Sequence, residues 1–460
     1  MISLLEVAER TQKGPKMEEK EWNLGLFRKL NALAKKYEIH YPNDGSWFST
    51  DESMVDRAWQ AALDFLVQEG VYCISTGRVV QFSEEEVKQA IKEIPAEVVM
   101  GEGRDQRIVT QGQLDCQGPL FWRPGHHAPF TEDLGPLVVK NFAMIGDPCY
   151  MEGFNFAVVD GREIYGLPIE AYAAKREMVW MREGVRKAGR PGMAVCLYPI
   201  NTRAAALIAP IDPGCAIRPT DGILLSTLPD VKMEHDLLTA AIVYEDYGCF
   251  KVNGGGSAAI GGFCGGLEGA IIESIVKPIA GWMVYRDGVT YAGVGYIGST
   301  TGRTISVKPD LAWANSLVCH VFNRKTSFVY WGGGTGGSTS GPGTDTFLWE
   351  VALGSIGAPI NGGHIAGPRQ HRAMMNASQT PMEAIWALEV AEAVRKKGYR
   401  RNEVNPILER IAAKLEGRPH AQGLPLEQCW DLVKHQPTPS YYEKYLRVKE
   451  ELASWGLQFD

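Results

Sequence analysis

The fold is decided by the stretch EAYAAKREMVWMREGVRKAGRPGMAVCLYPI at residues 170–200. Residues 170–189 place apolar side chains at helical spacing between charged ones, and the β-rich run GMAVCLYPI follows at 192–200. A strand that comes directly after a helix in this way is typical of a parallel sheet with crossover helices. The stretch therefore predicts an α/β fold.

The same alternation extends along the chain from about Arg104. Strand-like runs are DGILLST, LLTAAIVYE, GWMVYRDGVTYAGVGYIGST and TSFVYWGGG, at residues 221–227, 237–245, 281–300 and 326–334. PDLAWANSLVCHVFNRK at 309–325 has helical spacing. Several strand-like runs end in glycine or polar residues, and in a (β/α)8 barrel the active site lies at such strand ends.

Both ends of the chain are predicted to be helical. Residues 18–97 contain three helical patterns and a hairpin at 71–82 that turns at Thr76 and Gly77. TPMEAIWALEVAEAVRKKG at 380–398 opens with a Thr cap and a first-turn Pro, and EKYLRVKEELASWG at 443–456 is amphipathic. We expect a helical N-terminal subdomain at 1–103, a core at 104–378 and C-terminal helices at 379–460.

Composition excludes several classes of protein. The 460 residues carry a net charge of -7 with both signs mixed, which argues against a nucleic-acid partner. No run reaches the roughly 18 to 20 apolar residues of a membrane span, and the N-terminus becomes charged too early for a signal peptide, so we expect a cytoplasmic protein. The nine cysteines form no C-x-x-C pair, so neither a disulfide framework nor a cysteine zinc cage is indicated.

Candidate acids lie at the end of the run that begins at residue 237. Tyr244, Glu245 and Asp246 combine a phenol with two carboxylates at an expected strand end. Adjacent carboxylates raise one another's pKa, so one of them could act as a general acid near neutral pH.

Two further groups of residues could bind a ligand, but each also has a simpler explanation. Glu350, His364 and His371 could together bind zinc, although three such residues also occur by chance. The glycine clusters at 254–256, 261–266 and 332–337 could cradle a phosphate or form turns at a barrel rim, but no complete nucleotide-binding motif is present.

AGRPGMAVC at 188–196 resembles a signature of the monomethylamine:corrinoid methyltransferase family. The resemblance continues in VYCISTGRVV, GEGRDQ, IGGFCGGLEGAIIESIV, GSTTGRT, SGPGTDTFLWE, TPMEAIWALEVAEA, NEVNPILERI and QPTPSYYEKY, in order along nearly the whole chain. It implies a (β/α)8 TIM barrel with helical N-terminal and C-terminal extensions. It also implies a homo-oligomer and a separate corrinoid (cobalamin) protein that docks over the barrel mouth and accepts a methyl group on Co(I).

The chain departs from the family where the resemblance places the amine-handling groups. The family has pyrrolysine at the position of Cys196 and a catalytic glutamate at the position of Gly255. Near residues 328–337 it has a glutamine and a tyrosine, where this chain has Tyr330, Trp331 and a glycine loop. We expect Cys196, Asn201, Gly255, Tyr330 and Trp331 to line the substrate pocket.

These replacements are aromatic or small, which suits a flat aromatic substrate. The main hypothesis is therefore an O-demethylase methyltransferase that moves a methyl group from a phenyl methyl ether to the Co(I) of a partner corrinoid protein. The leaving ether oxygen would need an acid, for which Glu245, Asp246 and Tyr244 are the candidates, or a metal at Glu350, His364 and His371. Alternatives are an N-methyl (methylamine-type) substrate handled without pyrrolysine, a non-catalytic corrinoid-protein-binding scaffold, and a phosphate-binding barrel.

Overall fold

A closed ring of parallel strands forms the centre of the molecule in the computed structural model. The structure describes residues 2–124, 130–153, 156–198, 203–215, 217–296, 307–335, 338–368 and 379–459. Within these ranges the ring strands are β5 (Trp122–Arg123), β6 (Tyr150–Glu152), β9 (Ala194–Leu197), β10 (Gly222–Leu224), β12 (Phe250–Asn253), β14 (Val289–Ala292), β16 (Val329–Gly332) and β17 (Ile365–Ala366). Six of them form one sheet in the order β16-β14-β12-β10-β9-β6, and β17 pairs in parallel with β5.

Backbone hydrogen bonds join the two sheets into one ring. The His364 amide donates to the Tyr330 carbonyl (3.2 Å), and the Gly332 amide donates to the His364 carbonyl (3.1 Å), which links β17 to β16. On the other side the Cys149 amide donates to the Trp122 carbonyl (2.9 Å), which links β6 to β5. The (β/α)8 TIM barrel is therefore confirmed.

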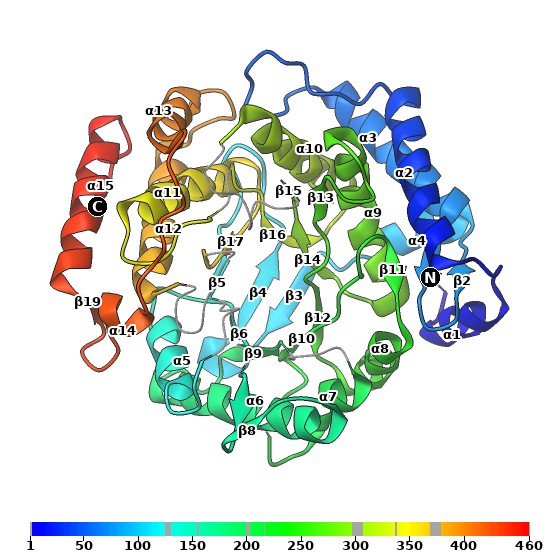
Figure 1. Cartoon of the computed structure of the whole chain (residues 1–460), viewed down its shortest axis with the longest axis horizontal. Coiled ribbons are helices and arrows are strands. Elements are labelled where there is room, and N and C mark those ends of the chain that lie inside the picture. Colours follow the sequence, from blue (N-terminus) through cyan, green and yellow to red (C-terminus); the bar gives the residue numbers. More distant parts are fainter. Residues whose placement is uncertain are drawn as a thin grey trace.

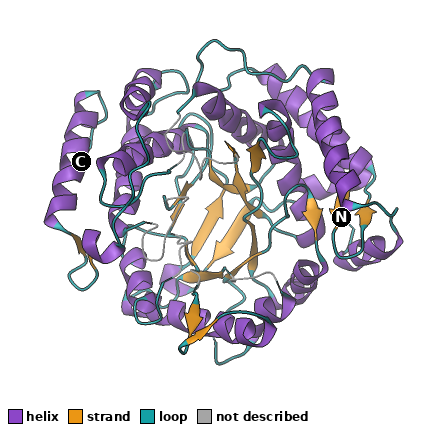
Figure 2. Cartoon of the chain, viewed as in Figure 1, coloured by secondary structure: helices purple, strands orange, loops and turns teal. Residues whose placement is uncertain are grey.

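A ring of helices surrounds the strands, as Figures 1 and 2 show. In chain order these are α5 (Gly135–Ala143), α6 (Leu167–Lys187), α7 (Ala204–Ile208), α8 (His235–Tyr247), α9 (Leu267–Tyr285), α10 (Pro309–Lys325), α11 (Asp345–Ile360) and α12 (Pro381–Lys397). Each follows one ring strand. The domain boundary expected at residue 378 falls just before α12. This helix follows β17 as the other ring helices follow their strands, so it belongs to the barrel.

Both extensions are helical, as predicted. The N-terminal part contains α1 (Leu4–Lys13), α2 (Glu19–Lys36), α3 (Glu52–Glu69), β1 (Val71–Cys73), β2 (Arg78–Val80) and α4 (Glu84–Lys92), and the C-terminal part contains α13 (Asn405–Leu415), α14 (Leu426–Cys429) and α15 (Pro439–Ser454). The predicted hairpin is confirmed, because β1 and β2 pair antiparallel on either side of Thr76 and Gly77. The minor elements are β7 (Val158–Val159), β8 (Arg162–Glu163), β11 (Lys232–Met233), β13 (Ala258–Ile260), β15 (Val294–Tyr296), β18 (Trp430–Asp431), β19 (Gln436–Pro437) and the 3-10 turns η1 (Gly103–Asp105) and η2 (Ala209–Ile211).

An antiparallel hairpin of β3 (Glu97–Met100) and β4 (Arg107–Thr110) crosses the centre of the ring in Figure 1. The Gly101 amide donates to the Thr220 carbonyl (3.0 Å) and the Glu102 amide to the Gly192 carbonyl (2.8 Å), so the hairpin meets the residues that precede β10 and β9. It therefore covers the amino-terminal end of the barrel. The carboxyl ends of the strands form the opposite end, where barrel enzymes place their active sites.

The expected strand at residues 237–245 is wrong, because this run belongs to helix α8. Its buried side chains are Leu237, Leu238, Ala240, Ala241 and Tyr244, which lie on one helical face. A short apolar run with β-branched residues does not by itself distinguish a buried strand from a helix. The beginning of the run at 281–300 is likewise the end of α9.

Helix α9 is the most enclosed helix of the ring, since residues 269–285 are all buried. It packs against α2 and α3 of the N-terminal extension on one side and against strands of the barrel on the other. This enclosure explains its apolar sequence. Among the described residues, no helix combines the length and hydropathy needed to cross a membrane.

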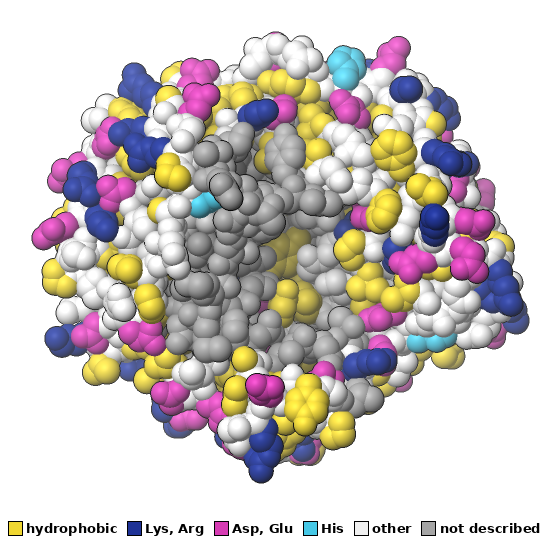
Figure 3. All heavy atoms as spheres, in the orientation of Figure 1, with side chains coloured by type: hydrophobic (Ala, Val, Ile, Leu, Met, Phe, Trp, Pro, Cys, Tyr) yellow, Lys and Arg dark blue, Asp and Glu magenta, His cyan; other side chains and the backbone are white. Residues whose placement is uncertain are grey.

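The face seen in Figure 1 is hollowed near its centre, over the ring of strands (Figure 3). Hydrophobic side chains are visible at the floor of the hollow, whereas charged side chains dominate the periphery.

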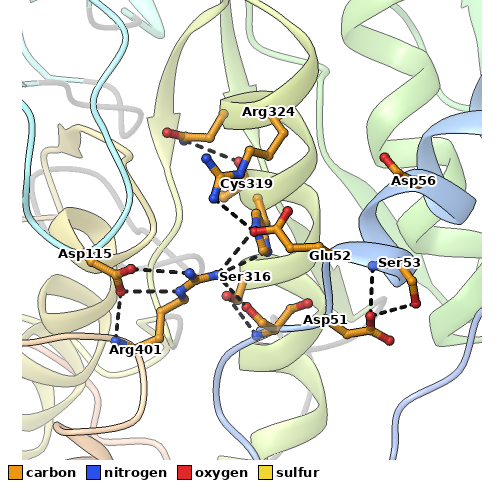
Figure 4. A network of polar contacts seen from close by, with 12 residues as sticks. Asp51, Glu52, Ser53, Asp56, Asp115, Ser316, Cys319, Arg324 and Arg401 are labelled. Carbon is orange, nitrogen blue, oxygen red and sulfur yellow. Dashed lines mark hydrogen bonds and ion pairs between the residues drawn. The ribbon is translucent and has the colours of Figure 1, made fainter.

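Arg401 connects the two extensions to the barrel in the polar network of Figure 4. Its guanidinium donates from Nη1 to the Ser49 carbonyl (3.0 Å) and forms an ion pair with Asp115 (3.3 Å). The same Nη1 lies 3.2 Å from Nδ1 of His320 on α10, and His320 Nε2 lies 3.1 Å from Oε1 of Glu52 on α3. One side chain from the C-terminal part therefore joins three segments that are distant in sequence.

Replacing Arg401 with Gln should lower the stability of the whole chain by about 2 kcal/mol, because charged hydrogen bonds from a largely buried group are lost together. Urea unfolding followed by tryptophan fluorescence measures the shift. Arg447→Gln is the matched control, since Arg447 pairs with Asp345 on the surface and should cost well under about 1 kcal/mol. Equal shifts for the two variants would contradict this role of Arg401.

Candidate active site in the barrel

A buried ion pair lies inside the barrel at the carboxyl ends of the first two strands. Arg123 is the last residue of β5 and Glu152 the last residue of β6, and both side chains have no exposed surface. Nη1 of Arg123 donates to Oε2 of Glu152 (2.6 Å), and the Tyr291 hydroxyl on β14 donates to Oε1 (2.7 Å). A buried ion pair is expensive to desolvate, so its position at the strand ends makes it the candidate functional site.

Aromatic rings surround the guanidinium of Arg123. Its Cζ lies 5.8 Å from the ring centre of Tyr150, 4.8 Å from that of Tyr291 and 5.8 Å from that of Trp331. Tyr150 and Trp331 meet edge to face at 5.6 Å. We call Arg123, Tyr150, Glu152, Tyr291 and Trp331 the inner cluster. All but Tyr291 are fully buried, and Tyr291 is partly exposed.

Several polar atoms of the inner cluster have no hydrogen-bond partner within the described part of the chain. They are Nε and Nη2 of Arg123, the Tyr150 hydroxyl and Nε1 of Trp331. Buried donors are usually paired, and an unpaired group costs about 1 to 3 kcal/mol. Their concentration at one place distinguishes this cluster from an ordinary barrel core.

Cys196 lies in β9 and is fully buried among the residues that fill the barrel, including Tyr150, Phe250 and Trp331. Burial raises the pKa of its thiol well above the usual value, and the nearby Glu152 carboxylate acts in the same direction. Cys196 therefore remains a thiol and packs as a small apolar side chain. Asn201, the other pocket residue expected after this strand, lies outside the described residues.

Trp331 and Tyr330 point to opposite faces of β16. Trp331 packs inside the barrel, whereas Tyr330 packs against Phe322 of the helix layer and donates to the Asn361 carbonyl (2.6 Å). The expectation that both line the pocket is therefore wrong for Tyr330. Successive residues of a strand alternate between faces, so adjacent residues cannot both face the barrel interior.

Gly255 lies in the turn after β12, where no side chain can be added without moving the backbone. A Cβ at this position would lie 2.1 Å from the Thr227 carbonyl oxygen, and the Gly255 amide donates to Oδ1 of Asn253 (2.9 Å). Gly255 thus packs two strand-end loops against each other. The backbone here leaves no room for a catalytic carboxylate at residue 255.

Tyr244, Glu245 and Asp246 lie far from the carboxyl ends of the strands. They are at the end of α8, shortly before β12 begins, so they lie at the amino-terminal end of the barrel. The Tyr244 hydroxyl donates to the Leu207 carbonyl (2.8 Å), while Glu245 and Asp246 are exposed. Their catalytic role was suggested by an expected strand end. That placement is wrong, because this segment is a helix.

The metal site expected at Glu350, His364 and His371 is not assembled in the described residues. Both Glu350 oxygens accept hydrogen bonds from Thr339 and Ser340, and the two ring nitrogens of His364 bond the Thr110 carbonyl (2.7 Å) and the Phe121 amide (3.3 Å). His371 lies outside the described residues. No group of three potential metal ligands occurs among the residues that the structure describes.

No sequence pattern predicted Arg123, Tyr150, Glu152 or Tyr291 as site residues. β5 and β6 are very short and belong to no recognised motif, so the periodicity of the chain does not select their residues. Tyr291 lies within the strand-like run at 281–300, but not at its end. The available signal was local: the runs FWRPG at 121–125 and CYMEGF at 149–154 each place one charge beside aromatic residues and a glycine.

The fold and this cluster define a (β/α)8 barrel with a polar site at its strand ends, and comparison with known proteins identifies its family. The family model of monomethylamine methyltransferase MtmB matches residues 2–457. Monomethylamine methyltransferase MtmB2 of Methanosarcina acetivorans is 26% identical over 460 residues, which cover 98% of this chain and 97% of the relative. MtmB of Methanosarcina mazei is 25% identical over 460 residues, which cover 98% of this chain and 97% of that relative.

Two solved structures share this fold. The crystal structure of the Methanosarcina barkeri monomethylamine methyltransferase MtmB and that of a hydroxylamine MtmB complex each have a TM-score of 0.89 at 24% identity, and each covers 99% of this chain and 98% of its own. The chain therefore belongs to the MtmB family of methyltransferases, and the expected family is confirmed. The relatives are named for monomethylamine, so they give no support to the hypothesis of a phenyl methyl ether substrate.

Gly255→Ala should lower stability by about 1 to 3 kcal/mol, because its Cβ would press on the Thr227 carbonyl. Thermal unfolding compared with the parent measures the effect. The matched control is Gly25→Ala in α2, where a Cβ meets nothing within 4 Å and alanine favours the helix. A Gly255→Ala variant as stable as the parent would refute the packing role of this glycine.

The stability of the protein should depend on pH through His364. Burial lowers the pKa of His364 from 6.5 to about 4. Between these values the unfolded chain binds a proton that the folded chain does not, so this contribution to stability is lost as pH falls from about 6.5 to 4, up to about 3 kcal/mol. Urea unfolding of the parent and of His364→Gln at pH 7 and pH 5 should show the smaller pH effect in the variant.

His40→Gln is the control for replacing a histidine, because His40 is exposed on the surface. If His364→Gln had the same pH dependence as the parent, His364 would not be held neutral by the fold.

Proposed function

We propose that this protein transfers a methyl group from an N-methyl compound to the Co(I) of a separate corrinoid protein. The observation that carries the proposal is the match to the MtmB family over nearly the whole chain, with a buried polar and aromatic cluster at the strand ends. The corrinoid protein would dock over the barrel mouth, and the methyl donor would bind at the inner cluster. That the protein forms a homo-oligomer stays a prediction.

The position of the acids supports nitrogen over oxygen as the atom that loses the methyl group. A methylated ammonium leaves as a neutral amine, whereas a phenyl methyl ether needs an acid at its oxygen. The acids expected for an ether, Glu245 and Asp246, lie on the outer helix at the other end of the barrel. Glu152, the carboxylate of the inner cluster, is already paired with Arg123.

The aromatic rings support the same choice. Methylated ammonium groups bind on the faces of aromatic rings through cation-π attraction, which grows when the site is desolvated. The rings of Tyr150, Tyr291 and Trp331 already surround the guanidinium cation of Arg123 in this way. The partly exposed Tyr291 lies where a donor would enter the cluster from the mouth.

In the reaction, the N–CH3 bond breaks and its electron pair stays on nitrogen. The Co–C bond forms with an electron pair of Co(I), so cobalt becomes methyl-Co(III) and the donor becomes the demethylated amine, which then takes up a proton from water. The protein must hold the methyl carbon in line between nitrogen and cobalt and exclude water. The inner cluster supplies the rigid surface for this positioning.

Trp331→Ala should lower kcat/KM for methyl transfer by about 100-fold, because it removes one wall of the inner cluster. The assay mixes the enzyme anaerobically with reduced corrinoid protein, or with free cob(I)alamin, and records methyl-Co(III) formation from methylamines and N-methyl amino acids. Tyr330→Phe is the matched control on the same strand, and it should retain the parental rate because Tyr330 faces the helix layer.

Transfer from guaiacol-type ethers but from no N-methyl compound would overturn the proposal in favour of an O-demethylase. Transfer from no donor to either acceptor would favour the non-catalytic scaffold. Equal activity of Trp331→Ala and the parent would place the site outside the inner cluster.

A further inference from the structure

The unpaired polar atoms of the inner cluster have the same chemical character. Nε and Nη2 of Arg123 and Nε1 of Trp331 can only donate hydrogen bonds, and none of them has a partner in the described part of the chain. The Tyr150 hydroxyl is also unpaired, and burial raises its pKa well above the usual value, so it keeps its proton. The cluster therefore offers donors from three fully buried side chains.

The free edge of Arg123 has the geometry that suits a carboxylate. Nη1 is occupied by Glu152 (2.6 Å), which leaves Nε and Nη2. The Nε–H and one Nη2–H of a planar guanidinium point in the same direction and match the two oxygens of a carboxylate. The rings of Tyr150 and Trp331 lie beside the guanidinium, with each ring centre 5.8 Å from Cζ of Arg123.

The charges of the cluster point to the same kind of ligand. Arg123 and Glu152 balance each other, so this ion pair carries no net charge. A methylammonium ion would add an unbalanced positive charge beside the guanidinium, which is costly in a buried site. A donor that carries both an ammonium and a carboxylate adds no net charge.

We infer that the methyl donor of this protein carries a carboxylate, bound by the Nε and Nη2 edge of Arg123 with the Tyr150 hydroxyl and Nε1 of Trp331. This inference rests on the proposed transfer from nitrogen. The substrate class is an N-methylated amino acid, with its carboxylate deep in the barrel and its methyl group toward the mouth. Glu152 acts as a positioning residue that holds Nη1 and turns the free edge of Arg123 to the ligand.

Calorimetric titration with N-methylglycine, its amide and monomethylamine tests the carboxylate directly and needs no corrinoid. We expect N-methylglycine to bind at least 100-fold more tightly than the amide or monomethylamine. Arg123→Lys keeps the charge but loses the fork, and Trp331→Phe keeps a ring but loses the donor. Each substitution should weaken the binding of N-methylglycine at least 10-fold, whereas Tyr330→Phe should not weaken it.

Methyl transfer to cob(I)alamin from the same compounds separates this inference from the proposed function. Transfer from monomethylamine that equals or exceeds transfer from N-methylglycine would overturn the carboxylate site and leave the proposed function standing. Binding of N-methylglycine that depends on Arg123, without transfer from any N-methyl compound, would support the carboxylate site and overturn the proposed function. Equal binding of the acid and its amide, or full binding by Trp331→Phe, would overturn the inference even if Arg123→Lys failed to fold.

Discussion

Closure of the strand ring is the constraint on which the rest of the structure depends. β17 must pair with β16, the ring strand before it, and with β5, the first strand of the ring, so the second contact joins the two ends of the barrel sequence. His364 stands at this junction: its backbone joins β16, and its ring bonds both the Thr110 carbonyl of the β3–β4 hairpin and the Phe121 amide. His364 is buried because it lies where the strand ring closes, and burial keeps its imidazole neutral.

Closure also fixes which side chains meet inside the barrel. Because strand residues alternate between faces, Trp331 faces the interior and Tyr330 faces the helix layer. The same alternation directs Arg123, Glu152 and Tyr291 inward from three different strands. The inner cluster is thus a product of the ring, since no two of these three residues are close in sequence.

Apolar packing and polar contacts together hold the extensions to the barrel. Arg401 reaches Ser49 before α3, Asp115 before β5 and His320 on α10, so that loss of this one residue would loosen three segments together. Next to α10 in the ring of helices, α9 is buried between the strands and the N-terminal helices. The chain therefore folds around the barrel, and in the proposed function the partner docks over the barrel mouth.

The sequence by itself determined the alternation of strands and helices, the helical ends, the hairpin at residues 71–82 and, through ordered motifs along the chain, the family. These features are encoded locally, by periodicity, caps and turns. It failed where local patterns are ambiguous, as in α8, whose apolar run is compatible with a strand until its buried face is known. Only the tertiary structure could show that Arg123, Glu152 and Tyr291 converge, or that Gly255 has no space for a side chain, because those facts depend on contacts between strands distant in the chain.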